Sequence, residues 1–181
     1  MRPLSIAVFL LAAGLAPAFA ADAPAPAAVQ AFLAAHAHAP GVTVRASGLQ
    51  VRTIKNGMGR RITPRDGVQI YYTAKLADGR VVDSTSPGLP APIDLSNTLP
   101  GLGEGLQQMR EGDHWELTLP PALAFGAKGS KGGAIPPGQS LTFDITVAAV
   151  TPATMGGTGP SNGFSIAAGG GESHAYYTIH P

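Results

Sequence analysis

Few residues of this chain have the chemistry of a nucleophile or a general base. The sequence has no cysteine and five histidines: His36, His38, His114, His174 and His180. Only His114 lies in the central part of the sequence, where a surface turn is a more common setting for it than a catalytic site. His36 and His38 lie two residues apart in an expected helix, so their side chains diverge and do not chelate a metal. Neither nucleophilic nor metal-dependent catalysis is therefore favoured.

A different kind of site is indicated by apolar and aromatic residues near one carboxylate. Phe125 and Ile135 lie in the Gly-rich stretch LAFGAKGSKGGAIPPG, where a core residue is not normally placed. Asp83 follows two valines in an expected strand, and burying an acid there is costly unless it has a partner. The candidate residues are Tyr72, Val82, Asp83, Leu99, Leu102, Phe125, Ile135 and Phe143.

The segments that must position these residues have the alternation of β-strands. In VQIYYTAKL, residues 68–76, apolar and polar side chains alternate, and Asp78-Gly79 then favours a tight turn into a second strand, RVVDS. HWELTLP (114–120) and LTFDITV (141–147) alternate in the same way, and a less regular strand is expected near 49–54. Leu102, Leu106 and Met109 have helical spacing, with Gly112 as a stop signal. We expect an α+β fold in which antiparallel strands wrap around one short helix.

The two ends of the sequence predict export. Residues 1–20 have Arg2, an apolar run from Ile6 to Leu15 and the Ala18-Phe19-Ala20 cleavage pattern of a signal peptide. A buried N-terminal helix is the alternative. Residues 21–47 are Ala- and Pro-rich, with Val29, Phe32, Leu33 and His36 at the spacing of a short amphipathic helix. Residues 151–181 are Gly-rich without periodicity and are expected to form a flexible tail.

Charge and composition limit the partners. Twelve Lys and Arg residues face 11 Asp and Glu residues, so the sequence does not predict a basic surface for nucleic acid. Without cysteine, an exported protein has no disulfides and no lipid-modified cysteine, so its stability depends on its own core. We expect a periplasmic or secreted protein with no membrane anchor after cleavage of the signal peptide.

The order and spacing of YTAKLADGRVVDS, LPGLGEGLQQMREGD, LAFGAKG, IPPG and LTFDITV resemble the FKBP-type peptidyl-prolyl cis-trans isomerases. The resemblance covers residues 48–150 and is greatest to the bacterial exported branch. It implies a curved antiparallel sheet of about five strands around one short α-helix. It also implies rotation about X-Pro bonds of exported proteins as the reaction, with no metal and no cofactor.

The resemblance also assigns roles to residues. It implies that Tyr72, Asp83, Phe125 and Phe143 are catalytic, and that Val82, Thr98, Leu99, Leu102 and Ile135 bind substrate. Thr98 and Leu99 match the pair before the helix, where a backbone N–H binds a ligand carbonyl in relatives. Proline-containing unfolded or partly folded exported proteins are the implied partners. Because residues 21–47 have room for only a short helix, we expect a monomer.

Three positions depart from the family pattern. Val82 replaces a Phe before the Asp, Leu102 replaces a Trp on the pocket floor, and Phe125 replaces a Tyr. The floor is then less aromatic, and one hydroxyl donor to a bound carbonyl is lost, at about 1 kcal/mol of binding free energy. Two hypotheses follow: an isomerase with reduced activity, or a non-catalytic, chaperone-like binding module that kept the fold.

Overall fold

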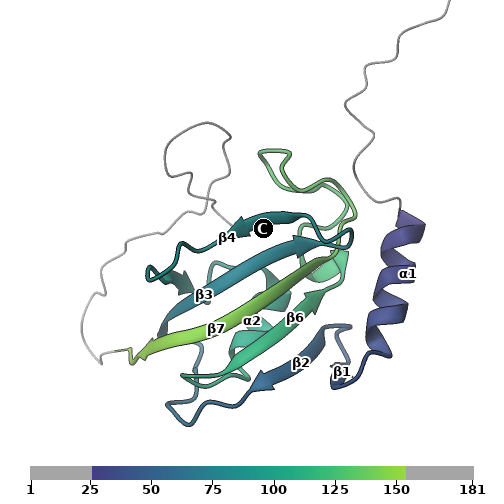
Figure 1. The fold of residues 1–181 in the computed structure, drawn as a ribbon. Coiled ribbons are helices and arrows are strands. Elements are labelled where there is room, and N and C mark those ends of the chain that lie inside the picture. Colours follow the sequence, from purple (N-terminus) through teal and green to yellow (C-terminus); the bar gives the residue numbers. More distant parts are fainter. Residues whose placement is uncertain (1–25, 154–181) are drawn as a thin grey trace, which may run out of the picture.

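The computed structural model describes residues 26–153 and contains one curved, open antiparallel sheet with helices beside it (Figure 1). The sheet order is β1-β2-β6-β7-β3-β4, and β5 also pairs with β3. The strands are β1 (Val42–Val44), β2 (Gln50–Lys55), β3 (Gly67–Leu76), β4 (Val81–Ser84), β5 (Ala91–Asp94), β6 (His114–Leu119) and β7 (Leu141–Thr151). The helices are α1 (Pro26–Ala37) and α2 (Pro100–Leu106), with a short 3-10 turn, η1 (Pro121–Leu123). The expected fold class is confirmed; the expected signal peptide and residues 154–181 of the expected tail lie outside the described residues.

Strand alternation separates an apolar inner face from a polar outer face. On β7, Leu141, Phe143, Ile145 and Val147 are buried, while the residues between them are partly exposed. An extra residue in β7 shifts its register with β3 between Gln69 and Ile70, so the next buried residue is Val150. The inner side chains of β3, β6 and β7 form one apolar cluster with α2, which lies behind the sheet in Figure 1. The sheet faces expected from the alternation are confirmed.

The hairpin expected at Asp78-Gly79 is also present. Gly79 has a φ of 85°, and the backbone N–H of Leu76 donates to Arg80 O at 2.9 Å, closing the turn between β3 and β4. Two short strands, β1 and β5, extend the sheet beyond the five strands that the sequence suggested. Their three and four residues are too few for a visible alternation.

Helix α2 is shorter than its apolar spacing predicted. It ends at Leu106, and Met109 is buried in the turn that follows, where its N–H donates to Leu106 O at 2.9 Å. Gly101 and Gly105 let the helix approach the sheet closely: a Cβ at Gly101 would lie 2.7 Å from Leu119 Cγ, and one at Gly105 would overlap Leu117. The glycines thus lower the helix propensity but allow close packing on β6.

Helix α1 lies along the β1–β2 side of the sheet (Figure 1). Val29 and Leu33 are buried, and Phe32 and His36 are half-buried, as the expected amphipathic spacing requires. The amide of Gln50 on β2 donates to Leu33 O at 2.9 Å, which ties α1 to the sheet. Across residues 26–153, no helix has the length and apolar character needed to cross a bilayer.

The packing of α2 predicts that Gly105→Ala destabilises the fold although alanine favours helix. The new methyl group overlaps Leu117, whose side chain is fully buried, so we expect a loss of about 1–3 kcal/mol in the free energy of unfolding. Urea denaturation measures it. Gly67→Ala is the control, since its Cβ would lie 3.8 Å from Thr151 Cβ, an ordinary contact. Equal stabilities of the two variants would contradict the packing argument.

Candidate functional site

Tyr72 and Asp83 form the polar centre of the candidate site. They lie on the adjacent strands β3 and β4, and the Tyr72 hydroxyl donates a hydrogen bond to Asp83 Oδ2. The backbone of Tyr72 is held from the same side, because its N–H donates to Thr85 Oγ1 at 3.1 Å and its carbonyl accepts from Thr85 N at 3.0 Å. The partner that a partly buried Asp83 requires is therefore Tyr72, which lies on β3 two positions from Ala74, the residue directly across from Asp83.

The carboxyl group of Asp83 is perturbed by its surroundings. Burial raises its pKa, and the hydrogen bonds from the Tyr72 hydroxyl and from the Ser84 backbone N–H lower it by less, so the net shift is upward. In the folded state Asp83 therefore holds its proton to higher pH than an exposed carboxylate does.

Aromatic and aliphatic side chains form the apolar base of the site. The Phe143 ring on β7 lies 6.1 Å from the Tyr72 ring, with 50° between the ring planes. Leu99 and Leu102, at the start of α2, expose 1% of their surface each, and Phe143 exposes 2%. Tyr72, Leu99, Leu102 and Phe143 all belong to the same apolar cluster, so the site continues directly into the core.

The Gly-rich loop adds two further residues to this cluster. Ile135 is 7% exposed, and Phe125, two residues after the end of η1, is partly buried against the cluster. The turn before Ile135 is closed by hydrogen bonds: Ser130 N donates to Ile135 O, and Ile135 N donates to Ser130 Oγ, each at 2.9 Å. Gly129, with a φ of 70°, would place a Cβ against the carbonyl of Ile135. The loop thus directs Ile135 inward.

The candidate residues divide into a closed base and an accessible rim. Leu99, Leu102, Ile135, Phe143 and Tyr72 are buried. Val82, Asp83, Thr98 and Phe125 are partly exposed. Two of the three family departures, Val82 and Phe125, lie on this rim. The third, Leu102, is in the base. The Thr98 hydroxyl is enclosed and has no hydrogen-bond partner among the described residues.

A cavity of about 230 Å³ lies elsewhere. Asp144 and Thr146 line it from the polar face of β7, together with Tyr71, Thr73 and residues 85–87. Among the candidate residues only Tyr72 contributes to it. This cavity is therefore on the outer face of the sheet, opposite the Phe143 side chain.

Sequence reasoning missed several contacts of the site and its surroundings. Thr85, which holds the Tyr72 backbone, lies just beyond the RVVDS motif, and the strand-turn-strand pattern was the signal that could have indicated it. His114 is not in a turn but begins β6, where its Nε2 lies 2.8 Å from Asp144 Oδ1. Within residues 26–153, no three His, Asp or Glu side chains are grouped so that they could hold a metal ion.

Comparisons with known proteins agree on one family. Residues 59–148 match the model of the FKBP-type peptidyl-prolyl cis-trans isomerases. The chain is 42% identical over 121 residues to the "Outer membrane protein MIP" of Legionella longbeachae, covering 66% of this chain and 52% of that protein. It is 41% identical over 115 residues to the FKBP-type 22 kDa peptidyl-prolyl cis-trans isomerase of Escherichia coli, covering 63% and 55%. The chain spans about half the length of these curated relatives.

Solved structures show the same likeness. A peptidyl-prolyl cis-trans isomerase from Pseudomonas syringae pv. tomato superimposes with a TM-score of 0.65 at 32% identity, covering 72% of this chain and 98% of that one. FkpA from Escherichia coli gives a TM-score of 0.66 at 32% identity, covering 71% of this chain and 60% of that one. The family match includes every candidate residue from Tyr72 to Phe143.

The Tyr72–Asp83 hydrogen bond predicts the titration of the site. Asp83 should titrate above the usual range of aspartate, and Tyr72→Phe should raise its pKa further, because the lost hydrogen bond favours the charged form. Carboxyl ¹³C chemical shifts measured against pH report both values. Tyr71→Phe, whose side chain lies on the outer face, should leave the Asp83 titration unchanged.

The raised pKa of Asp83 also determines how the stability of the fold depends on pH. A raised pKa in the folded state means that Asp83 costs no stability at acid pH and reduces stability as the pH rises through the raised pKa. The free energy of unfolding of Asp83→Asn relative to the parent should therefore grow with pH over that range. A relative stability that falls with pH would contradict the burial of this carboxyl group.

Proposed function

Because the chain belongs to the FKBP-type peptidyl-prolyl cis-trans isomerases, we propose that it catalyses rotation about X-Pro bonds. The observation that carries the proposal is the Tyr72–Asp83 pair beside the aromatic ring of Phe143, within the residues that match the family model. Its substrates are proline-containing segments of unfolded or partly folded exported proteins. We propose residues 48–150 as the catalytic domain, acting as a monomer in the periplasm or outside the cell after residues 1–20 are removed.

The reaction requires no nucleophile. The uncatalysed barrier of roughly 20 kcal/mol comes from the loss of amide resonance as the bond twists. A twisted amide is less dipolar than a planar one, so transfer from water to an apolar surface costs the twisted state less. The wall formed by Phe125, Ile135 and Phe143 would thus lower the barrier through differential binding of the twisted state.

The hydrogen-bond donors of the site limit how the substrate carbonyl is held. The Tyr72 hydroxyl donates to Asp83, and Phe125 has no hydroxyl. The donor that the family resemblance supplies is the backbone N–H before α2, at Thr98 and Leu99. Asp83, whose second carboxylate oxygen is not used by Tyr72, is the acceptor on the rim. We therefore propose that Asp83 orients the peptide and that the apolar wall favours twisting.

Protease-coupled isomerisation of an X-Pro peptide tests the proposal. The parent should accelerate the cis-to-trans step, and Asp83→Asn should lower kcat/KM on the order of tenfold, the effect of about 1.4 kcal/mol in the transition state. Asp144→Asn is the matched control: the same substitution on the outer face should retain the parental rate. A parental rate equal to the uncatalysed one would instead support the binding-module hypothesis.

The departures from the family pattern predict that activity can be increased. Phe125→Tyr returns a hydroxyl donor to the rim and should raise kcat/KM about fivefold, which corresponds to about 1 kcal/mol. Adding Leu102→Trp would fill the base with a larger aromatic side chain, but Leu102 is 1% exposed, so we expect a loss of stability in return. The same peptide assay, with urea denaturation in parallel, measures both. An unchanged or lower rate for Phe125→Tyr would show that this hydroxyl does not limit turnover.

A further inference from the structure

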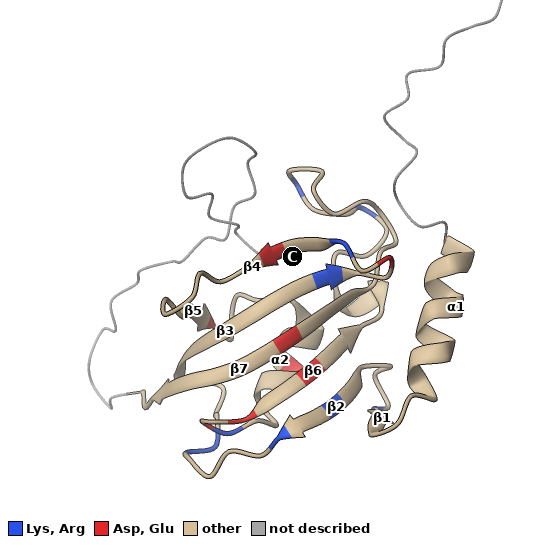
Figure 2. Ribbon diagram, in the orientation of Figure 1, with Lys and Arg blue, Asp and Glu red and all other residues tan. Residues whose placement is uncertain are grey.

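The outer face of the sheet carries charges in a cross-strand row. Arg52 on β2 pairs in register with Glu116 on β6, and Glu116 pairs with Asp144 on β7. Figure 2 shows the two acidic residues side by side on β6 and β7. Like charges directly across a strand pair destabilise a sheet, and each of these carboxylates has a nitrogen-bearing side chain beside it. Arg52 donates to Glu116 Oε2 at 2.8 Å, and His114 contacts Asp144 Oδ1 at 2.8 Å.

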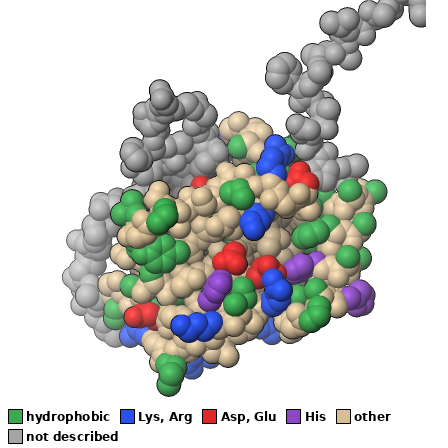
Figure 3. Space-filling view, viewed as in Figure 1, with side chains coloured by type: hydrophobic (Ala, Val, Ile, Leu, Met, Phe, Trp, Pro, Cys, Tyr) green, Lys and Arg blue, Asp and Glu red, His purple; other side chains and the backbone are tan. Residues whose placement is uncertain are grey.

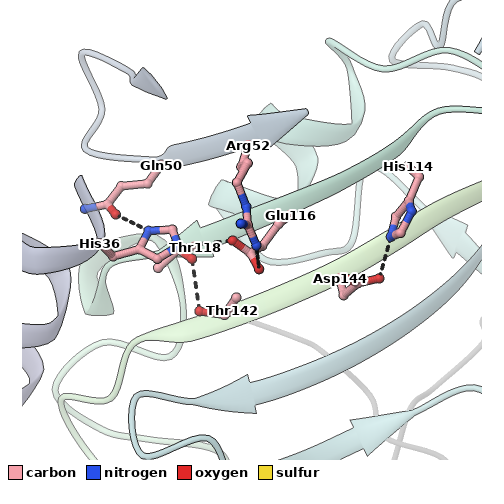
Figure 4. Close-up of polar contacts among 8 residues, drawn as sticks. All are labelled: His36, Gln50, Arg52, His114, Glu116, Thr118, Thr142 and Asp144. Carbon is pink, nitrogen blue, oxygen red and sulfur yellow. Dashed lines mark hydrogen bonds and ion pairs between the residues drawn. The ribbon is translucent and has the colours of Figure 1, made fainter. Parts of the chain in front are cut away.

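Helix α1 adds a second histidine to this row (Figure 4), and Figure 3 shows histidine side chains beside acidic and basic ones on this face. His36 extends from α1 with Nδ1 2.6 Å from Gln50 Oε1 and Nε2 3.1 Å from Glu116 Oε1. The side chains of His36 and Glu116 are each 15% exposed, so this contact is largely sheltered from water. Phe32, one turn earlier on α1, stacks on the imidazole ring with 5.7 Å between centroids.

Both partners of the His36 ring are hydrogen-bond acceptors. The orientation of the Gln50 amide is fixed by its other end, because Nε2 donates to Leu33 O at 2.9 Å. Its Oε1 therefore faces His36 Nδ1 and requires a donor there. Glu116 requires a donor at Nε2. A neutral imidazole has a single N–H, so only the doubly protonated ring satisfies both contacts.

The charged side chain in contact with His36 is Glu116, and the other titratable groups lie on the neighbouring elements. Glu116 and His114 lie on β6, Asp144 on β7, Arg52 on β2, Lys75 on β3, and His38 just beyond the end of α1. Although burial raises the pKa of Glu116, the hydrogen bonds and charges of Arg52 and His36 lower it by more, so Glu116 stays ionised. The ionised carboxylate is the group that a cationic His36 contacts.

We propose that His36 is a pH-sensitive latch that holds helix α1 on the outer face of the sheet when its imidazole is protonated. The latch joins residues that are 80 positions apart in the sequence. Deprotonation removes one of the two donated hydrogen bonds and the charge that faces Glu116. Helix α1 then keeps the buried side chains of Val29 and Leu33, the hydrogen bond from Gln50 to Leu33 O and one hydrogen bond of His36. With one contact and its charge lost, the undocked population of α1 rises.

The pH dependence has two limits. Docking is lost as the pH rises and the imidazole gives up its second proton, because one donated hydrogen bond and the charge facing Glu116 go with it. It is also lost as the pH falls through the lowered pKa of Glu116, since the protonated carboxyl no longer attracts His36. Docking is therefore strongest at mildly acidic pH, between these titrations.

Distance measurements between two spin labels on the full chain test the latch. The sequence has no cysteine, so Gln30→Cys on α1 and Lys55→Cys on β2, both at exposed positions, give specific labelling. At about pH 6 we expect a narrow distance distribution to dominate. At about pH 8.5 we expect a broad second population, from undocked α1, that is several times larger than at pH 6. Emission from Trp115, the single tryptophan, checks that the sheet stays folded at both pH values.

Two histidine variants separate the latch from other titrations. His36→Gln should abolish the difference between the two pH values, because glutamine does not titrate. His38→Gln removes a histidine only two positions away and should keep the parental difference. The proposal is overturned if the parental distributions are the same at both pH values, or if His36→Gln still shows the parental change.

Discussion

The pairing of β3 with β7 is the constraint on which the rest of the structure depends. Their register places Ala74 opposite Phe143 and Thr73 opposite Asp144, so one alternation assigns Phe143 to the inner face and Asp144 to the outer face. A shift of one residue would exchange the two faces, removing the aromatic wall of the site and burying an acid. The apolar site and the charged row are thus two consequences of a single register.

The sequence was sufficient to predict those parts of the fold that repeat along the chain. Alternation identified the buried residues of β3, β6 and β7, and Asp78-Gly79 identified the hairpin. The end of α2 could not be predicted from spacing, because Met109 is buried in a turn at a position that also continues the helical pattern. The contact of His36 with Glu116 is set by packing of segments far apart in the sequence, for which no local pattern exists.

The candidate site was predictable as a set of residues but not as an arrangement. Motif spacing named Tyr72 and Asp83, whereas their mutual hydrogen bond depends on the register of the β3–β4 hairpin. The division between a buried base and an exposed rim depends on how the Gly-rich loop closes through Ser130. This division separates the three departures from the family: Val82 and Phe125 are partly exposed beside the apolar cluster, while Leu102 fills the core.

We propose that the inner-face residues around Asp83 catalyse rotation of the X-Pro bond. The most direct measurement is two-dimensional exchange NMR of a proline-containing peptide with a substoichiometric amount of the protein. With the parent protein we expect exchange peaks between the cis and trans proline signals that are absent for the peptide alone and much weaker with Asp83→Asn. A spectrum with the parent protein that is identical to that of the free peptide would contradict it.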